Sequence, residues 1–220
     1  MFNFNISQLP IYLMRIPVLL LALTIHEFAH GYVAYKLGDY TASITGRLSM
    51  NPLKHLDPVG AVCMLIFGFG WAKPVPIDTR NFKNPKRDMA LSALAGPVAN
   101  FILAFVGMFF YMLAARFLYS PMMNGNMLAY AVILFLQVFF MLNLGLAVFN
   151  MIPIPPLDGS RIFLTFLPTK LYFKVMQYER YIMIVMFALI FFGVLDRPLG
   201  WLISTIANGM QYVLSFLPFI

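Results

Sequence analysis

The chain has 220 residues, of which 61% are hydrophobic and 10% are charged, and its mean hydropathy is +0.82. Ordinary soluble domains carry roughly 25% charged residues, so this composition indicates a membrane protein. The net charge of +7 lies in short segments between apolar runs, which argues against nucleic-acid binding. The single cysteine, Cys63, excludes an intramolecular disulfide and a thiolate cluster, so any metal site must use histidine and carboxylate ligands.

The first half of the chain predicts one long helix and then shorter elements. We expect a helix over about Pro10–Lys36, because proline is tolerated in a first turn and glycine follows the apolar pattern. Tyr40–Leu48 is rich in β-branched residues, which favours a short strand or β-hairpin. Residues 59–72 are apolar but only 14 long with three glycines, so we expect a re-entrant or peripheral segment. Lys73–Asp88, with a net charge of +3, is expected to be a solvated loop.

The second half is dominated by apolar runs. We expect helices over about Met89–Leu118, Met127–Asn150 and Tyr178–Leu195, and a last helix over Trp201–Leu217 after a turn at residues 197–200. The predicted fold is an all-α polytopic membrane protein with a core of three transmembrane helices. We expect one domain over residues 1–220, with its core over about 10–165, C-terminal helices over about 177–220 and no cleaved signal peptide.

The motif His26-Glu27-Phe28-Ala29-His30 lies in the second half of the first predicted helix. Two imidazoles four positions apart share a helix face and can bind one metal ion, while Glu27 can polarise a metal-bound water. Zinc suits these ligands, because it accepts histidine nitrogen and carboxylate oxygen and leaves a position open. The alternative is that the histidines only pack in a bundle and Glu27 pairs with a lysine or arginine. Three ionisable residues at membrane depth are costly without a function, which favours the metal site.

A catalytic zinc site needs a third protein ligand, and His55 and seven carboxylates remain as candidates. We favour Asp158, because the three prolines between Asn150 and Asp158 prevent regular helix and let the chain turn back into the protein. The alternative is that Asp158 caps the next helix at a membrane surface. His55 is most simply an interfacial histidine, and a contact with a metal ligand or with substrate is its alternative role.

Three segments together resemble the site-2 proteases, a family of intramembrane zinc metalloproteases. They are His26-Glu27-Phe28-Ala29-His30, Gly96-Pro97-Val98-Ala99-Asn100, and Leu157-Asp158-Gly159 with its upstream Asn150 and prolines. The segments occur in the family's order and cover about residues 10–165. The resemblance implies one zinc ion bound by His26, His30 and Asp158, with Glu27 as general base and Asn100 and Asn150 near the bound substrate. We expect the compact form of the family, without the PDZ or nucleotide-sensing domain of many relatives.

The two asparagines also have a reading from physical chemistry. An amide in an apolar helix must form hydrogen bonds, and a peptide strand in a cleft offers backbone groups as partners. Contacts between helices are the alternative for both residues. The two roles are evenly balanced for Asn150, and substrate contact is slightly favoured for Asn100 because Gly96-Pro97 frees backbone groups just before it.

The distribution of positive charge predicts the topology. The histidines and Asp158 must meet on one side of the bilayer, which requires an even number of crossings between them. If residues 59–72 do not cross, 12 of the 15 Lys and Arg residues lie inside and only Arg15, Arg116 and Arg197 lie outside. This asymmetry satisfies the positive-inside rule.

We therefore predict a multi-pass zinc metalloendopeptidase of a bacterial or archaeal cell membrane, with its active site toward the cytoplasm. Its expected partners are a transmembrane protein substrate and the lipid bilayer, and not nucleic acid. A metal-ion transporter is one rival, but it gains nothing from a glutamate between the ligand histidines. The other rival is a catalytically silent homologue, which would be expected to have lost one of the four zinc-site residues. This chain retains all four. The sequence does not identify the substrate or the oligomeric state.

Overall fold

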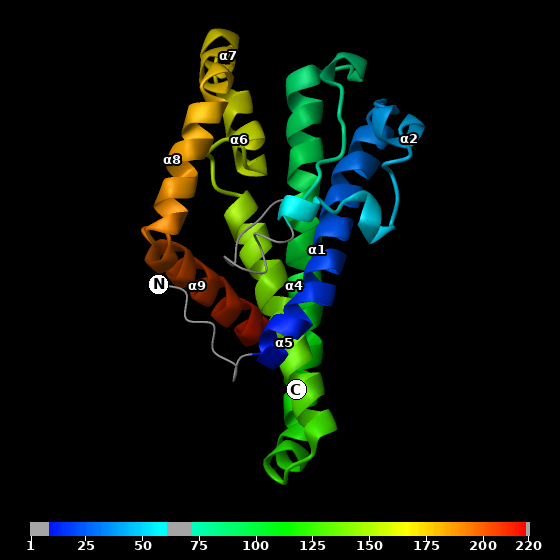
Figure 1. Cartoon of the computed structure of the whole chain (residues 1–220), viewed down its shortest axis with the longest axis vertical. Coiled ribbons are helices and arrows are strands. Elements are labelled where there is room, and N and C mark those ends of the chain that lie inside the picture. The colour runs from blue at the N-terminus through cyan, green and yellow to red at the C-terminus, as the bar shows by residue number, and fades with distance from the viewer. Residues whose placement is uncertain (1–8, 61–71, 219–220) are drawn as a thin grey trace.

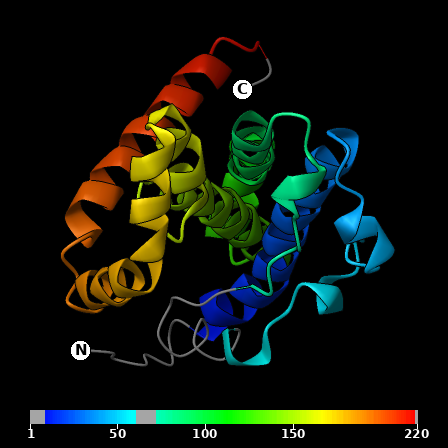
Figure 2. The same cartoon turned by 90° about the horizontal axis from the view of Figure 1, so that it is seen from above.

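Three long helices form the centre of the molecule. In the computed structural model, which describes residues 9–60 and 72–218, they are α1 (Leu9–Lys36), α4 (Pro85–Met123) and α5 (Met127–Asn150). Figures 1 and 2 show α4 and α5 between α1 on one side and α9 (Asp196–Leu214) on the other. The three central helices are each long and apolar enough to cross a membrane, in agreement with the predicted three-helix core.

A tight turn joins α4 to α5. Gly125 adopts a positive φ of 86°, which an L side chain rarely allows. The Asn126 side chain then caps α5 by accepting hydrogen bonds from the N–H groups of Leu128 and Ala129. The two helices approach closely at Gly107, where an added Cβ would lie 2.7 Å from the Phe139 ring. This close contact makes α4 and α5 a packed helical hairpin.

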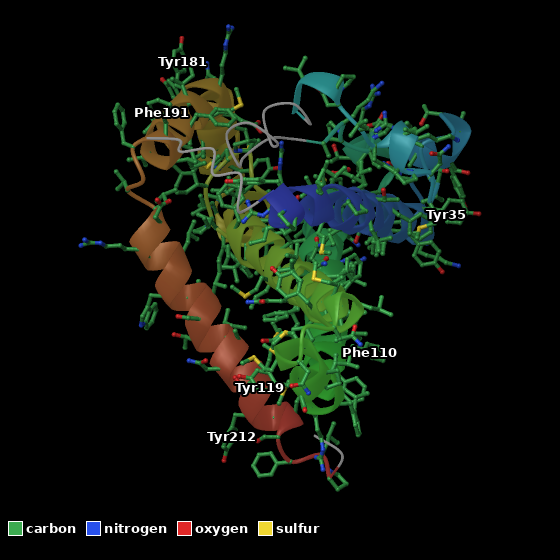
Figure 3. The ribbon with its side chains drawn as sticks, turned by 60° about the horizontal axis from the view of Figure 1, so that its bottom comes forward. Tyr35, Phe110, Tyr119, Tyr181, Phe191 and Tyr212 are labelled. Carbon is green, nitrogen blue, oxygen red and sulfur yellow. The ribbon has the colours of Figure 1, made fainter. Side chains whose placement is uncertain are left out.

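Apolar side chains between the helices make up the core. The larger cluster joins α4, α5 and α9, and it is built from Ala104, Met108, Phe140, Leu144, Val148, Met210 and Leu214. A smaller cluster of Val18, Leu134 and Val138 attaches α1 to α5. Both clusters lie on faces turned toward other helices, and many large apolar side chains point outward instead. Figure 3 shows Tyr181, Phe191 and Tyr212 at the periphery, where each is more than half exposed. Such a surface suits lipid as the surrounding solvent.

Short helices complete the described chain. Before α4 these are α2 (Thr41–Ile44), η2 (Pro52–Lys54) and η3 (Thr79–Asn81). After α5 the chain forms α6 (Asp158–Phe163), η4 (Leu164–Phe166) and α7 (Thr169–Gln177), which sequence patterns did not predict. The next helix, α8 (Glu179–Phe191), meets α9 at a bend of 81°, and the two could form one broken span.

The predicted strand or β-hairpin over Tyr40–Leu48 is wrong. This segment contains the helical turn α2, and the described residues contain no strand. The cause is Asp39, whose carboxylate accepts hydrogen bonds from the N–H and hydroxyl of Thr41 and starts a turn that the β-branched composition does not reveal. The predicted re-entrant segment over residues 59–72 lies almost wholly outside the described residues.

The predicted turn at residues 197–200 is also wrong, because α9 begins at Asp196 and includes these residues. Pro198 stands in the first turn of α9, where its missing N–H would have had no helical partner.

Candidate metal centre

Three buried or half-buried side chains from distant parts of the chain converge on one point. His26 and His30 lie on α1 and Asp158 is the first residue of α6. The Oδ2 atom of Asp158 lies 3.1 Å from Nε2 of His26 and 3.3 Å from Nε2 of His30. The two Nε2 atoms are 3.0 Å apart. This group could therefore hold a metal ion, as the sequence predicts.

Hydrogen bonds on the far side of each ring fix which nitrogen carries the proton. Nδ1 of His30 lies 2.7 Å from the backbone carbonyl oxygen of Ser92, which can only accept, so Nδ1 must donate. Nδ1 of His26 lies 2.5 Å from the side-chain oxygen of Asn100 and donates to it in the same way. A neutral imidazole has only one N–H, so each Nε2 presents a lone pair.

The convergence of three acceptors indicates a cation. Two Nε2 lone pairs and a carboxylate oxygen face one another, and among the described residues Asp158 Oδ2 has no hydrogen-bond partner. Buried acceptors without donors repel one another, and a divalent cation satisfies all three at once. Two histidine nitrogens and one carboxylate oxygen form a ligand set that zinc accepts in catalytic sites.

Gly96 on α4 lets the two histidine rings pack against that helix. An added Cβ there would lie 2.5 Å from Cε1 of His30 and 2.6 Å from Cε1 of His26. Both distances are shorter than real Cβ contacts, so any larger residue must displace a ring. The glycine of the Gly96–Asn100 motif therefore has a packing role next to the metal centre.

Asp158 is positioned by the chain that returns from α5. An added Cβ at Gly159 would lie 2.5 Å from the carbonyl oxygen of Ile152, so the Asp158–Gly159 backbone packs tightly on the end of α5. The Ser160 hydroxyl donates a 2.7 Å hydrogen bond to the Leu157 carbonyl and stabilises the start of α6. The alternative of a helix cap does not describe Asp158, because the residue at the N-cap position is Leu157.

Glu27 lies beside the metal group and is held by a segment from before α4. Its Oε2 atom accepts a 2.8 Å hydrogen bond from the backbone N–H of Val75. That segment is itself tied down, since the Lys73 N–H donates to the His55 carbonyl and the Arg47 guanidinium donates to the carbonyls of Lys73 and Pro74. Glu27 is buried and its carboxylate has a fixed orientation.

The three predicted polar residues outside the metal group have different surroundings. Asn100 is fully buried against His26, and its Nδ2 donates to the Ala22 carbonyl and to Oδ1 of Asn143.

Asn150 is half-buried, and its amide donates to the Leu146 carbonyl one turn earlier in α5. His55 is buried and its Nε2 lies 2.7 Å from the Ser49 carbonyl. The substrate roles expected for Asn100 and Asn150 stay predictions.

Sequence reasoning missed Asn143. It is a fully buried amide on α5, seven residues before Asn150 and so on the same helix face. An uncharged amide in an apolar helix was a signal for Asn150, and the same signal was present at Asn143.

The chain is similar to a known peptidase family and to several zinc metalloproteases. The model of "Peptidase family M50" matches residues 118–193. Over 173 residues the chain is 45% identical to the putative zinc metalloprotease YwhC of Bacillus subtilis, covering 78% of this chain and 77% of YwhC. It is 30% identical over 155 residues to the putative zinc metalloprotease Rip2 of Mycobacterium tuberculosis, covering 68% of this chain and 55% of Rip2. It is 32% identical over 142 residues to the putative zinc metalloprotease MJ0611 of Methanocaldococcus jannaschii, covering 62% of each. No solved structure matches the chain.

A membrane protein with a His-Glu-x-x-His helix and a buried His–His–carboxylate group has the design of a metallopeptidase. The extent of the similarity to YwhC then fixes the family. The chain belongs to peptidase family M50, the site-2 protease family. The predicted family is thereby confirmed, and so, at the level of the family, is the predicted zinc metalloprotease.

Proposed function

We propose that this protein is an intramembrane zinc metalloendopeptidase that cleaves transmembrane segments of other membrane proteins. The observation that carries the proposal is the meeting of two Nε2 lone pairs with a carboxylate oxygen that has no hydrogen-bond partner among the described residues. The two histidines and Glu27 belong to α1, a helix apolar enough to span a membrane. A metal-binding group at membrane depth favours a substrate that itself lies in the bilayer.

Each residue of the centre has a distinct task. His26, His30 and Asp158 would hold the zinc ion. When bound, zinc supplies a Lewis acid that polarises the scissile carbonyl and a water molecule. Glu27 takes a proton from the attacking water and transfers it to the leaving amine. Because the Val75 N–H occupies Oε2 of Glu27, we assign the proton transfer to Oε1.

The substrate must reach this centre in an extended form, since a helical peptide bond has its carbonyl engaged in the helix. Asn150 is half-buried near the end of α5 and retains its proposed role as a polar contact for substrate backbone. The same role stays proposed for Asn100, whose amide forms hydrogen bonds with His26, Ala22 and Asn143.

We further propose a cell-membrane location with the active site toward the cytoplasm. Contacts between the segments on either side of residues 61–71 support this topology. The Lys73 N–H donates to the His55 carbonyl, and the Asp78 N–H donates to Asp39. Both flanks therefore lie on one side of the molecule, as the positive-inside rule requires for this chain. A single domain over residues 1–220 remains part of the proposal.

The decisive experiment combines metal analysis with cleavage. The full chain, purified in detergent, should contain one zinc per molecule, and co-expression with a candidate single-span substrate should yield a cut within the membrane segment. Protein that contains stoichiometric zinc only when His26, His30 and Asp158 are all intact supports the site. Zinc-free active protein, or cleavage that persists after chelation, would refute it.

A further inference from the structure

The strongest unassigned feature is a chain of hydrogen bonds that runs from α5 through α4 to a metal-ligand histidine. Asn143 Oδ1 accepts from Asn100 Nδ2 at 2.9 Å, and Asn100 Oδ1 accepts from Nδ1 of His26. We propose that Asn143 is a positioning residue for zinc binding, acting on His26 through Asn100. This proposal rests on the proposed role of His26 as a zinc ligand.

The direction of every bond in this chain follows from backbone groups. Asn143 Nδ2 lies 2.9 Å from the Phe139 carbonyl and Asn100 Nδ2 lies 3.3 Å from the Ala22 carbonyl. Backbone carbonyls only accept, so the nitrogen of each amide must face its carbonyl. The oxygen of Asn143 then faces Asn100, and the oxygen of Asn100 faces His26. The imidazole is left with one choice, which is to donate from Nδ1 and present the Nε2 lone pair to the metal.

Burial restricts the Asn100 and Asn143 amides to this orientation. Asn100 and Asn143 are both fully buried, so water does not provide a substitute partner. A reversed amide would place two donors or two acceptors face to face and leave buried polar groups unsatisfied, which is unfavourable. Asn143 thereby restricts Asn100 to the one orientation that suits a metal-binding His26.

The two ligand histidines differ in the group that accepts the hydrogen bond from Nδ1. Nδ1 of His30 is held by the backbone carbonyl of Ser92, which no side-chain substitution removes. Nδ1 of His26 is held by a side chain, which is in turn held by another side chain. Substitutions on α4 and α5 can therefore loosen His26 while the hydrogen bond of His30 is kept.

The test compares Asn143→Leu with the matched control Asn150→Leu. Each substitution replaces an α5 amide that donates to the carbonyl four residues earlier, but only Asn143 is connected to His26. Zinc affinity is measured on the metal-free full chain in detergent by competition with a chromogenic chelator. Loss of a partner that orients a ligand typically lowers metal affinity about 10–100-fold, so Asn143→Leu should weaken zinc binding by about 10-fold or more. Asn150→Leu should bind zinc like the wild type.

A spectroscopic readout separates positioning from general packing. In protein loaded with Co²⁺, Asn143→Leu should shift the ligand-field absorption bands, because the His26 ring moves relative to the metal, and Asn150→Leu should leave them in place. If Asn143→Leu does not fold, Asn143→Ala takes its place, with Asn150→Ala as its matched control. Asn143→Ala also removes the acceptor for Asn100 Nδ2, so it should likewise weaken zinc binding by about 10-fold or more.

The outcomes distinguish this inference from the proposed function. If His26→Ala binds zinc as tightly as the wild type, the metal site itself is misassigned and both proposals fail. If His26→Ala loses zinc but Asn143→Leu retains wild-type affinity and wild-type cobalt bands, only the positioning role is overturned. Equal weakening by Asn143→Leu and Asn150→Leu would also overturn it, because the effect would then come from disturbed helix packing.

Discussion

The Val75 N–H orients the Glu27 carboxylate, and Glu27 is not one of the three side chains that converge on the candidate metal centre. We predict that Glu27→Gln keeps bound zinc and the fold but stops cleavage, because an amide cannot take up the proton. General acid–base catalysis alone contributes about 10²–10⁴-fold, so the loss should be at least of that size. Zinc content and cleavage are measured on the same preparation. Turnover close to that of the wild type would contradict the proposed mechanism.

Asp158 differs from the other candidate third ligands because its Oδ2 atom faces the Nε2 atoms of both histidines. We predict that Asp158→Ala lowers zinc occupancy and activity together, since it removes one of three converging acceptors. His55→Ala should keep its zinc, because the His55 ring is directed to the Ser49 carbonyl. Asp57→Ala serves as a further control, since its carboxylate accepts from the N–H groups of Val59 and Gly60. Retention of stoichiometric zinc by Asp158→Ala, with loss in His55→Ala, would show that the third ligand is misassigned.

At the scale of elements, Asp39 connects the end of α1 to the segment that holds Glu27. Its fully buried carboxylate accepts hydrogen bonds from the N–H and hydroxyl of Thr41, from the Asp78 N–H and from the Asn81 amide. Burial acts to raise the pKa of Asp39, but the hydrogen bonds from Thr41, Asn81 and Asp78 outweigh it and hold the pKa below its ordinary value. The ionised form is therefore the one that stabilises the fold.

We predict that Asp39→Asn destabilises the protein by about 1–3 kcal/mol at pH 7, because an amide nitrogen would face buried donors. The folded pKa is depressed, so the contribution of Asp39 is complete above its unfolded pKa of about 4 and is lost as the pH falls through the lower folded value. Thermal unfolding in detergent should show a gap between variant and wild type at pH 7 that narrows below about pH 4. A gap independent of pH would contradict this role.

The sequence predicts elements best where apolar composition alone decides them. The helix Met127–Asn150 has the predicted bounds, because it runs uninterrupted from its cap at Asn126 to the proline-rich segment. For α4 the sequence predicts a start at Met89, four residues later than the observed start at Pro85, because the first turn of the helix is polar. There the Asp88 carboxylate accepts from the Asn84 N–H and Pro85 begins the helix. Such capping contacts depend on side-chain directions that hydrophobic periodicity does not encode.

The metal group was predictable because its residues have chemistry that the bilayer otherwise excludes. His26, His30 and Asp158 stand out as ionisable groups in or next to apolar runs, and the structure brings them together. The contacts that orient them were not predictable. The partner of His30 is a backbone carbonyl, which every residue has, and the link from Asn143 depends on the packing of three helices.

At the scale of the whole molecule, the topology can be tested with cysteines. Cys63→Ser removes the only native thiol, and new cysteines are placed at Ser43, Thr79 and Asn124, which are all exposed. We predict that a membrane-impermeant thiol reagent labels positions 43 and 79 only in inverted vesicles and position 124 only in intact cells. The reason is that α2 and η3 are joined through Asp39 on one side, while the α4–α5 turn lies a full helix length away. Labelling of 43 and 79 from opposite sides would mean that residues 59–72 span the membrane.

The tight turn at Gly125 has a consequence for biosynthesis. Because α4 and α5 are joined by so short a connection and pack closely at Gly107, they can enter the bilayer together after α1 is already in place. The ribosome must then add the proline-rich segment before Asp158 can return to the two histidines. His30 and Asp158, which converge in the candidate metal centre, are 128 positions apart in the chain (158 minus 30). The nascent protein therefore has no complete metal-binding group until all three central helices have been synthesised, which delays proteolytic activity until the membrane core has assembled.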